Sequence, residues 1–284
     1  MTKEFGAALE GGGMRGMFTA GVLDTLMNIN IYSSATVGVS AGAVFGCNYK
    51  SRQIGRTIRY NKAYCRDRRY ASIKNWILTG SVYSKKFAYE EIPNKLDPFD
   101  AKTFSENPMR FTVVCTDMAT GSAVYHDCEK GDSEDIEWMR ASAAVPVASS
   151  PVVIDGKSYL DGGISDSIPF RRVMSYGYEK NIAVLTQPLG YKKGPNEFLP
   201  FLERKFKNYP EFVNTVRVRH EMYNSELSEI AELEKKGALF VIRPSEKIVT
   251  NIVERNSKRL GDIYKLGASD MESRLEALKE YLEN

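Results

Sequence analysis

The stretch Thr36-Val37-Gly38-Val39-Ser40-Ala41-Gly42-Ala43 joins a short β-branched run to the first turn of an expected helix. A serine on such a sharp strand-to-helix turn is forced outward, and the small residues Gly38 and Gly42 let the backbone crowd there without clashes. The start of the helix also favours negative charge beside the hydroxyl. The pattern is typical of an activated serine nucleophile at Ser40, although a structural turn without chemistry has the same pattern.

Strands and helices are expected to alternate along the whole chain around this turn. We expect strands at residues 5–9, 35–39, 109–116, 122–126, 152–154, 158–160, 182–186 and 238–243. We expect helices at residues 17–28, 41–50, 84–96, 132–144, 169–176, 197–236 and 257–282, with further helical sequence as far as residue 83. This order predicts a three-layer α/β/α fold with helices on both sides of a mostly parallel sheet.

The domain organisation follows from the length and from the lack of a linker. The chain has 284 residues, and no Pro/Ser-rich stretch divides it. We therefore expect one domain over residues 1–284, with a core at about 5–190 that a C-terminal strand and helices at about 197–284 complete or cover.

A glycine loop, Gly11-Gly12-Gly13-Met14-Arg15-Gly16, follows the first expected strand and opens a helix. Its spacing fits a dinucleotide fingerprint, but the acidic residue that such a site needs about 20 residues further on is missing from residues 35–40. Backbone N–H groups at a helix start also stabilise anions, including a tetrahedral acyl intermediate. If the first two strands are neighbours, the loop lies beside Ser40 as its oxyanion hole, where Arg15 either adds charge or pairs with a carboxylate.

Ser40 needs a proton acceptor, and the chain has two histidines. His126 ends an expected hairpin strand, and His220 lies in a charged helical stretch that we expect to face solvent. The order Ser40, an aspartate, His220 is that of an α/β-hydrolase triad, so a Ser–Asp–His esterase stays open. Asp161, just past a strand in Leu160-Asp161-Gly162-Gly163, is the better candidate. A desolvated carboxylate can take the serine proton when transfer is concerted with attack on a carbonyl.

Composition indicates a globular chain in a reducing compartment. It is 43% hydrophobic and 26% charged, which allows a substantial core. Its four cysteines show neither CxxC nor metal-ligand spacing, and neither a signal-peptide pattern nor an apolar run of transmembrane length is present. We expect a cytoplasmic protein that uses neither a metal ion nor another cofactor.

The glycine loop, the motif around Ser40 and Asp161-Gly162-Gly163 stand in an order that closely resembles the patatin-like phospholipase family. The segment Ala141-Ser142-Ala143-Ala144-Val145-Pro146 is similar to that family too, and the similarity covers about residues 5–190. The resemblance implies a Ser–Asp dyad without histidine, in which Ser40 is the nucleophile and Asp161 the base. It assigns the loop from Gly11 to Gly16 to the oxyanion hole. It further implies a sheet between helices and metal-independent hydrolysis of acyl esters, often of lipids.

Basic residues are concentrated between Lys50 and Lys86. That stretch contains eleven Lys or Arg residues and one acid, Asp67, in a chain whose net charge is +3. Aromatic residues are interleaved with them, a composition that suits the surface of an anionic membrane. We expect either peripheral membrane contact by residues 50–86 or a solvated helical face that pairs with acidic residues elsewhere. Single-stranded nucleic acid would suit the same pattern, but a lipid-hydrolase site makes nucleic acid an unexpected partner.

Three functions follow in order of preference. The first is a serine acyl-ester hydrolase of lipase or phospholipase type that forms an acyl-enzyme through Ser40 and Asp161. The second is a Ser–Asp–His esterase that uses His126 or His220. The third is a non-catalytic module in which the glycine loop binds a nucleotide or an anionic lipid. The physiological ester, the position cleaved and the oligomeric state are left open.

Overall fold

Eight strands form one sheet in the computed structural model, which describes residues 3–284. Its parallel part has the order β3 (Arg110–Asp117), β2 (Ala35–Val39), β1 (Phe5–Leu9), β7 (Lys180–Val184), β8 (Phe240–Ile242). The antiparallel strands are β4 (Ala123–Cys128), β5 (Val152–Ile154) and β6 (Lys157–Asp161). β4 and β6 both pair with β3, and β5 pairs with β6. The mostly parallel α/β sheet expected from the sequence is confirmed.

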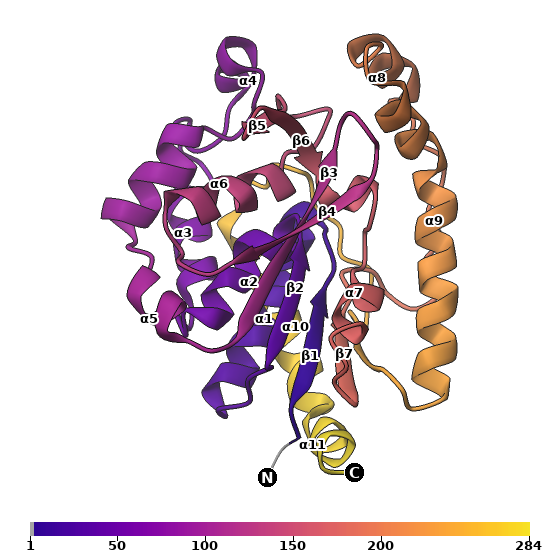
Figure 1. The fold of residues 1–284 in the computed structure, drawn as a ribbon. Coiled ribbons are helices and arrows are strands. Elements are labelled where there is room, and N and C mark those ends of the chain that lie inside the picture. Colours follow the sequence, from indigo (N-terminus) through magenta and orange to yellow (C-terminus); the bar gives the residue numbers. More distant parts are fainter. Residues whose placement is uncertain (1–2) are drawn as a thin grey trace.

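Helices cover both faces of the sheet (Figure 1). Phe5, Ala7 and Leu9 of β1 point to one face, while Ala8 points to the other, as the pleat of a strand requires. The first face packs against α1 (Gly16–Asn28), α2 (Ala41–Lys50) and α10 (Ser257–Ser273). The second packs against α7 (Phe170–Met174) and α9 (Pro210–Lys235). The three-layer arrangement follows from this alternation of buried side chains.

The remaining helices lie around the two ends of the sheet and along its antiparallel edge (Figure 1). They are η1 (Gly13–Arg15), α3 (Arg56–Tyr64), α4 (Ile73–Thr79), η2 (Lys85–Leu96, a π-helix), α5 (Ala101–Glu106), α6 (Ser133–Ser142), η3 (Gly162–Ile164), α8 (Leu199–Lys205) and α11 (Leu275–Glu283). No helix within residues 3–284 combines the length and hydropathy needed to cross a bilayer.

Three expected helical segments are wrong as continuous helices. The sequence before residue 83 breaks after α3, and Ala71 pairs with Tyr83 in an antiparallel bridge, so α4 sits on a closed loop. The segment 197–236 divides into α8 and α9 because Pro210, which lacks an N–H group, begins a new helix. The expected helix 257–282 is divided at Arg274 into α10 and α11. Helical propensity alone did not reveal these interruptions.

The C-terminal third packs directly on the first helix and on the sheet. β8 extends the sheet beside β7, and α10 crosses α1 at a glycine contact. A Cβ on Gly267 of α10 would overlap the carbonyl oxygen of Phe18, and one on Gly21 of α1 would overlap that of Tyr264. The two helix backbones therefore lie so close together that only glycine, which has no Cβ, fits at these two positions.

Candidate active site

Ser40 lies at the carboxyl end of β2, on the turn that opens α2. Its φ of 55° is in the left-handed region, which an L-residue adopts only when the surrounding structure enforces it. Gly38 and Gly42 make this possible, because a Cβ on Gly38 would meet the carbonyl oxygen of Gly42 and one on Gly42 would meet that of Leu9. The turn has the strained strand-to-helix geometry that its sequence predicts.

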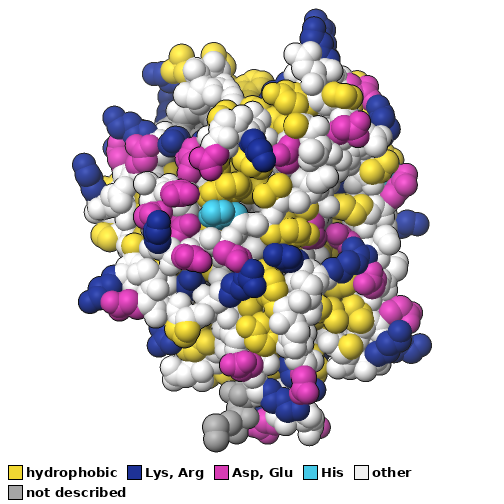
Figure 2. Space-filling model, in the orientation of Figure 1, with side chains coloured by type: hydrophobic (Ala, Val, Ile, Leu, Met, Phe, Trp, Pro, Cys, Tyr) yellow, Lys and Arg dark blue, Asp and Glu magenta, His cyan; other side chains and the backbone are white. Residues whose placement is uncertain are grey.

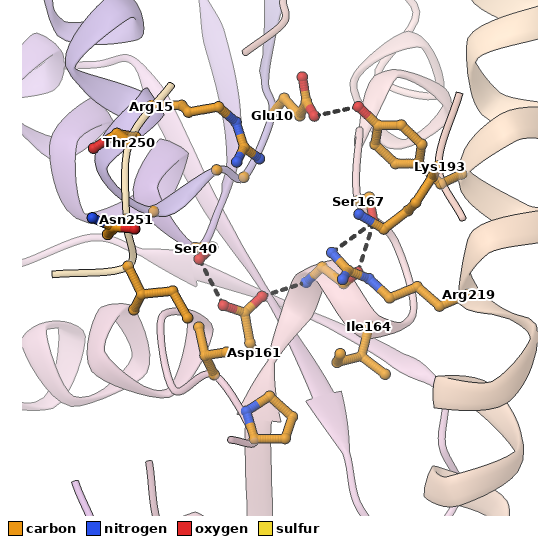
Figure 3. Close-up of a pocket in the computed structure, with 18 residues that line it drawn as sticks. Glu10, Arg15, Ser40, Asp161, Ile164, Ser167, Lys193, Arg219, Thr250 and Asn251 are labelled. Carbon is orange, nitrogen blue, oxygen red and sulfur yellow. Dashed lines mark hydrogen bonds between the residues drawn. The ribbon is translucent and has the colours of Figure 1, made fainter. Parts of the chain in front are cut away.

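Asp161, the last residue of β6, faces Ser40 across the end of the sheet (Figure 3). Ser40 Oγ donates a hydrogen bond of 2.6 Å to Asp161 Oδ2, and the N–H of Gly163 donates one of 2.8 Å to Oδ1. Burial raises the pKa of Asp161, while the bond from Ser40, the charge of Arg219 and the N–H of Gly163 act in the opposite direction. The sheet thus brings together two side chains that are 121 positions apart in sequence.

The glycine loop lies beside this pair, as parallel pairing of β1 with β2 requires. Three of its N–H groups already have acceptors: that of Gly11 donates to Ser167, that of Arg15 to Gly12 and that of Gly16 to Gly13 and Met14. In the described part of the chain, the N–H groups of Gly12, Gly13 and Met14 have no acceptor. All three residues line a pocket that Ser40 also lines.

Two residues that support the pair were not assigned a role from the sequence. Ser142, at the end of α6, accepts the N–H of Ser40 at 2.9 Å and donates to the carbonyl of Val114 at 2.6 Å, so it fixes the turn. Ser142 belongs to the segment 141–146, whose family resemblance in the sequence could have indicated a role for it. Arg219 of α9 donates to the carbonyl oxygen of Gly163 and thereby braces the residue that holds Asp161. Only the folded structure reveals Arg219, because no motif surrounds it.

Ser40 lies where two pockets meet. One, about 270 Å³, is lined by the glycine loop, Asp161 and several polar side chains (Figure 3). The other, about 90 Å³, is mainly apolar, and its lining includes Met14, Ala41, Val44, Phe45, Tyr60, Tyr70, Tyr83, Ala88, Val145 and Ile252. A hydroxyl at the junction of a polar and an apolar pocket suits an ester with one polar and one apolar part.

Among the described residues, neither histidine lines either pocket. His126 stacks on Trp138 with ring centroids 4.3 Å apart, and its Nε2 lies 3.7 Å from Asp135 Oδ1. His220 was expected to face solvent, but its side chain is only 23% exposed and its Nδ1 lies 3.1 Å from the carbonyl oxygen of Arg217. The structure brings no histidine to Ser40.

Potential metal ligands gather away from the two pockets, at His126, Cys128 and Asp135, whose ligand atoms lie within 4.8 Å of one another. Asp135 Oδ2 there accepts the N–H groups of Lys130 and Gly131, and burial raises the pKa of the Cys128 thiol. This cluster shares no residue with the Ser40 pockets.

Several of the basic side chains between residues 50 and 86 are bound to other groups of the protein. Lys50 donates to the carbonyl of Cys128 and Arg56 to that of Asp97. Three more cations pair with carboxylates, namely Arg59 with Asp97, Arg69 with Asp67 and Lys85 with Glu137. Figure 2 accordingly shows blue and magenta side chains intermixed on the face that it presents.

Residues 7–174 match the family model described as patatin-like phospholipase, which is more than half of the chain. The chain belongs to this family. Patatin-like phospholipases are lipid acyl hydrolases, and the Ser40 and Asp161 motifs both lie inside the matched residues. Residues 209–283, which form the C-terminal helices and β8, match a domain family of unknown function.

Several curated proteins are similar to the chain. The uncharacterized protein YjjU of Escherichia coli is 26% identical over 91% of this chain and 73% of its own length. An uncharacterized NTE family protein of Mycobacterium tuberculosis is 24% identical over 66% of this chain and 50% of its own. The lysophospholipase NTE1 of Meyerozyma guilliermondii is 23% identical over 92% of this chain but 18% of its own. Among solved structures, VipD from Legionella pneumophila aligns with a TM-score of 0.48 and 11% identity over 98% of this chain and 67% of that one.

Proposed function

We propose that this chain is a metal-independent serine acyl-ester hydrolase that forms an acyl-enzyme through a Ser40–Asp161 dyad. The observation that carries the proposal is the 2.6 Å hydrogen bond from Ser40 Oγ to the buried carboxyl group of Asp161. Burial supports the role of Asp161 as a base, because a desolvated carboxylate gains by accepting a proton. The strained turn supports the role of Ser40 as the nucleophile, because it holds the hydroxyl exposed to the pocket.

In the proposed reaction, Ser40 Oγ attacks the ester carbonyl carbon while Asp161 takes its proton. The carbonyl oxygen becomes an oxyanion, which the free N–H groups of Gly12, Gly13 and Met14 stabilise. Asp161 then returns the proton to the leaving alcohol, and the acyl group stays on Ser40. Asp161 next deprotonates a water molecule that attacks the acyl carbonyl, which releases the acid and restores the hydroxyl.

We further propose that residues 1–284 act as one catalytic unit in a reducing compartment such as the cytoplasm. Pairing of β8 with β7 and packing of α10 on α1 support a single unit. The four cysteines are buried and unpaired, which supports a compartment where thiols stay reduced.

We also propose peripheral contact with anionic membranes through the stretch from residue 50 to 86, centred on α4. Four large apolar side chains of α4 are exposed: Ile73 by 72%, Trp76 by 41%, Ile77 by 73% and Leu78 by 70%. Lys74 on the same helix, with Arg68 and Lys86 nearby in sequence, is exposed too. Apolar side chains flanked by cations suit the headgroup region of an anionic bilayer.

The position of α4 supports that contact. The bridge between Ala71 and Tyr83 closes the loop that carries α4, and Tyr70 and Tyr83 at its base line the apolar pocket beside Ser40. A lipid met by α4 would therefore lie close to the entrance of that pocket.

The proposed activity is tested by ester hydrolysis with the wild type and with Ser40→Ala. The wild type should release fatty acid from dispersed acyl esters, and Ser40→Ala should lose nearly all of that release. Equal release by a folded Ser40→Ala protein would reject Ser40 as the nucleophile. The remaining functions would then be a Ser–Asp–His esterase or a non-catalytic module that binds a nucleotide or an anionic lipid.

A further inference from the structure

The polar pocket beside Ser40 collects three cationic side chains from separate parts of the chain. Arg15 lies in the glycine loop, Lys193 lies in the loop after β7, and Arg219 projects from α9. In Figure 3, Arg15 lies on one side of the pocket and Lys193 and Arg219 reach it from the other side. Only Arg15 falls within the residues that match the patatin-like family, so the other two cations are contributed by the remainder of this chain.

None of the three cations forms an ion pair in the described part of the protein. Within residues 3–284, no carboxylate oxygen lies within 4.0 Å of a side-chain nitrogen of Arg15, Lys193 or Arg219. Arg15 Nε is buried without a hydrogen-bond partner among these residues. Arg219 donates only to the carbonyl of Gly163 and, at 3.5 Å, to Ser167 Oγ. All three side chains are partly buried, and a partly buried cation without an ion-pair partner is stabilised when an anion binds beside it.

Lys193 is held in place although its amino group is free. Its backbone N–H donates to Asn224 Oδ1 at 2.8 Å, and its carbonyl accepts from Nδ2 of the same side chain at 2.9 Å. Its amino group lies 4.9 Å from the ring centre of Tyr223. The loop is therefore fixed on α9 with the ammonium group directed into the pocket.

Both carboxyl groups that line the pocket already accept hydrogen bonds from other protein groups. Glu10 accepts the Tyr223 hydroxyl at 2.6 Å and the N–H of Thr186 at 2.5 Å, and burial raises its pKa. Asp161 is bonded to Ser40. The pocket therefore carries excess positive charge beside the serine hydroxyl.

We propose that this pocket binds a phosphate monoester carried by the substrate, so that the preferred ester has an acyl chain on one side of the scissile bond and a phosphate group on the other. The inference rests on the proposed function, because it places the phosphate beside Ser40. A phosphate monoester has a charge of about −1.5 to −2 and three acceptor oxygens, which match two guanidinium groups and one ammonium group. A choline or ethanolamine headgroup would place a further cation among three, which is unfavourable.

The apolar pocket completes this division of the substrate. It shares Ser40 and Gly13 with the cationic pocket, and its lining is rich in aromatic and aliphatic side chains. The acyl chain enters that side while the phosphate enters the other, and the ester carbonyl lies between them at Ser40. Two opposed pockets orient the ester for attack.

The test compares initial rates on three esters with the same oleoyl chain: monooleoylglycerol, oleoylglycerol phosphate and oleoylglycerol phosphocholine, in one detergent. We expect kcat/KM for the phosphate monoester to exceed both others at least tenfold. A soluble butyrylglycerol phosphate, compared with monobutyrylglycerol, shows whether the preference belongs to the phosphate itself rather than to a charged lipid surface. Equal kcat/KM for all three oleoyl esters would overturn the proposal while leaving Ser40-dependent hydrolysis intact.

Lys193→Gln provides the matched variant, because the Lys193 amino group makes no hydrogen bond in the described structure. We expect it to reduce the ratio of phosphate-ester to neutral-ester kcat/KM about tenfold, mainly through KM, while the adjacent exposed Lys192→Gln leaves the ratio unchanged. A ratio that Lys193→Gln does not alter would overturn the assignment.

A binding measurement keeps the proposal testable if no ester is hydrolysed. Calorimetry of glycerol phosphate with Ser40→Ala should show saturable binding that Lys193→Gln in the same background weakens about tenfold. Lack of binding, or equal binding by both proteins, would reject the phosphate site independently of catalysis.

Discussion

In the proposed mechanism Ser40 and Asp161 act as a unit, because the serine needs a proton acceptor and the carboxyl group needs the serine proton. The 2.6 Å bond between them gives the serine proton a destination, and the buried carboxyl group has the raised pKa that a base requires. We expect Asp161→Asn to lower kcat for ester hydrolysis by about 10²–10⁴. The double variant with Ser40→Ala should be scarcely slower than Ser40→Ala alone, because residues that act together are not additive. Substantial turnover by a folded Asp161→Asn enzyme would contradict this account.

Lys193 predicts a pH dependence of substrate binding. Burial and then the charges of Arg219 and Arg15 lower its pKa to about 8, while Glu10 has the opposite effect. Because the charged form binds phosphate, KM for a phosphate-bearing ester should rise as the pH increases through about 8. Lys193→Arg should remove this rise because a guanidinium stays charged there. A KM profile that is identical in wild type and Lys193→Arg would exclude Lys193 as the titrating group.

At the residue scale, the sequence predicted those parts of the site that are carried by local backbone geometry. Gly38-x-Ser40-x-Gly42 and Asp161-Gly162-Gly163 are short motifs whose glycines reflect close backbone contacts, so their spacing is visible in the sequence. Lys193 and Arg219 come from a loop and a helix without such motifs. Their approach to Ser40 depends on how α9 packs, which no local pattern encodes.

At the scale of elements, α4 is the most exposed apolar helix near the site. None of its residues is buried, yet it is anchored, because Ser150 Oγ donates to the carbonyl of Thr79 and the N–H of Val82 donates to the carbonyl of Ala148. Figure 2 shows apolar side chains at the top of the molecule, where Figure 1 places this helix. A fixed apolar projection is suited to insertion into a lipid surface.

The membrane proposal predicts that the double variant Ile77→Ser/Leu78→Ser binds vesicles with anionic lipid at least about tenfold more weakly. Burial of each side chain contributes about 1.5–3 kcal/mol, so the loss of two should exceed the 1.4 kcal/mol that corresponds to a factor of ten. Co-sedimentation measures this change. Ile54→Ser is the control, because Ile54 is 46% exposed in the same basic stretch but lies outside α4. An equal loss in the control, or no loss in the double variant, would leave α4 with only a structural role.

The break that creates α4 could not be foreseen from helical propensity. Residues 65–83 include several Arg and Lys residues, which suit a helix, and the sequence analysis extended helical structure through them. The chain instead turns back because Ala71 and Tyr83 pair and because Tyr70 stacks edge-on against Tyr83, with ring centres 5.3 Å apart. These are contacts between residues 12 or 13 positions apart, and tertiary contacts of this kind override local preference.

At the scale of the whole molecule, the close crossing of α1 and α10 ties the C-terminal third to the helix that follows the glycine loop. We expect Gly267→Ala to lower the free energy of unfolding by about 1–3 kcal/mol, because its methyl group would overlap the backbone of Phe18. Gly261→Ala in the same helix is the control. The nearest atom to its Cβ is the flexible Lys62 Nζ at 3.7 Å, so it should raise stability by up to about 1 kcal/mol.

Chemical denaturation of both variants tests this crossing. Equal stability of the Gly267→Ala and Gly261→Ala proteins would contradict a rigid contact between α1 and α10.

The alternation of strands and helices was enough to predict the three layers, because buried parallel strands have a strong sequence pattern. The sequence did not indicate that α10 packs against α1. Gly21 and Gly267 show no local pattern, and the need for glycine at these positions is visible only once the two helices are in contact.

The most direct test of the central claim is the site at which a fluorophosphonate attaches to the protein. Peptide mass spectrometry of the wild type should find one adduct per chain, on Ser40, because only an activated serine attacks the phosphorus. Labelling should be absent in Ser40→Ala, slowed about 10²–10⁴-fold in Asp161→Asn and within about tenfold of wild type in His126→Ala and His220→Ala. An adduct on another residue, no adduct at all, or loss of labelling in a folded histidine variant would contradict the Ser40–Asp161 dyad.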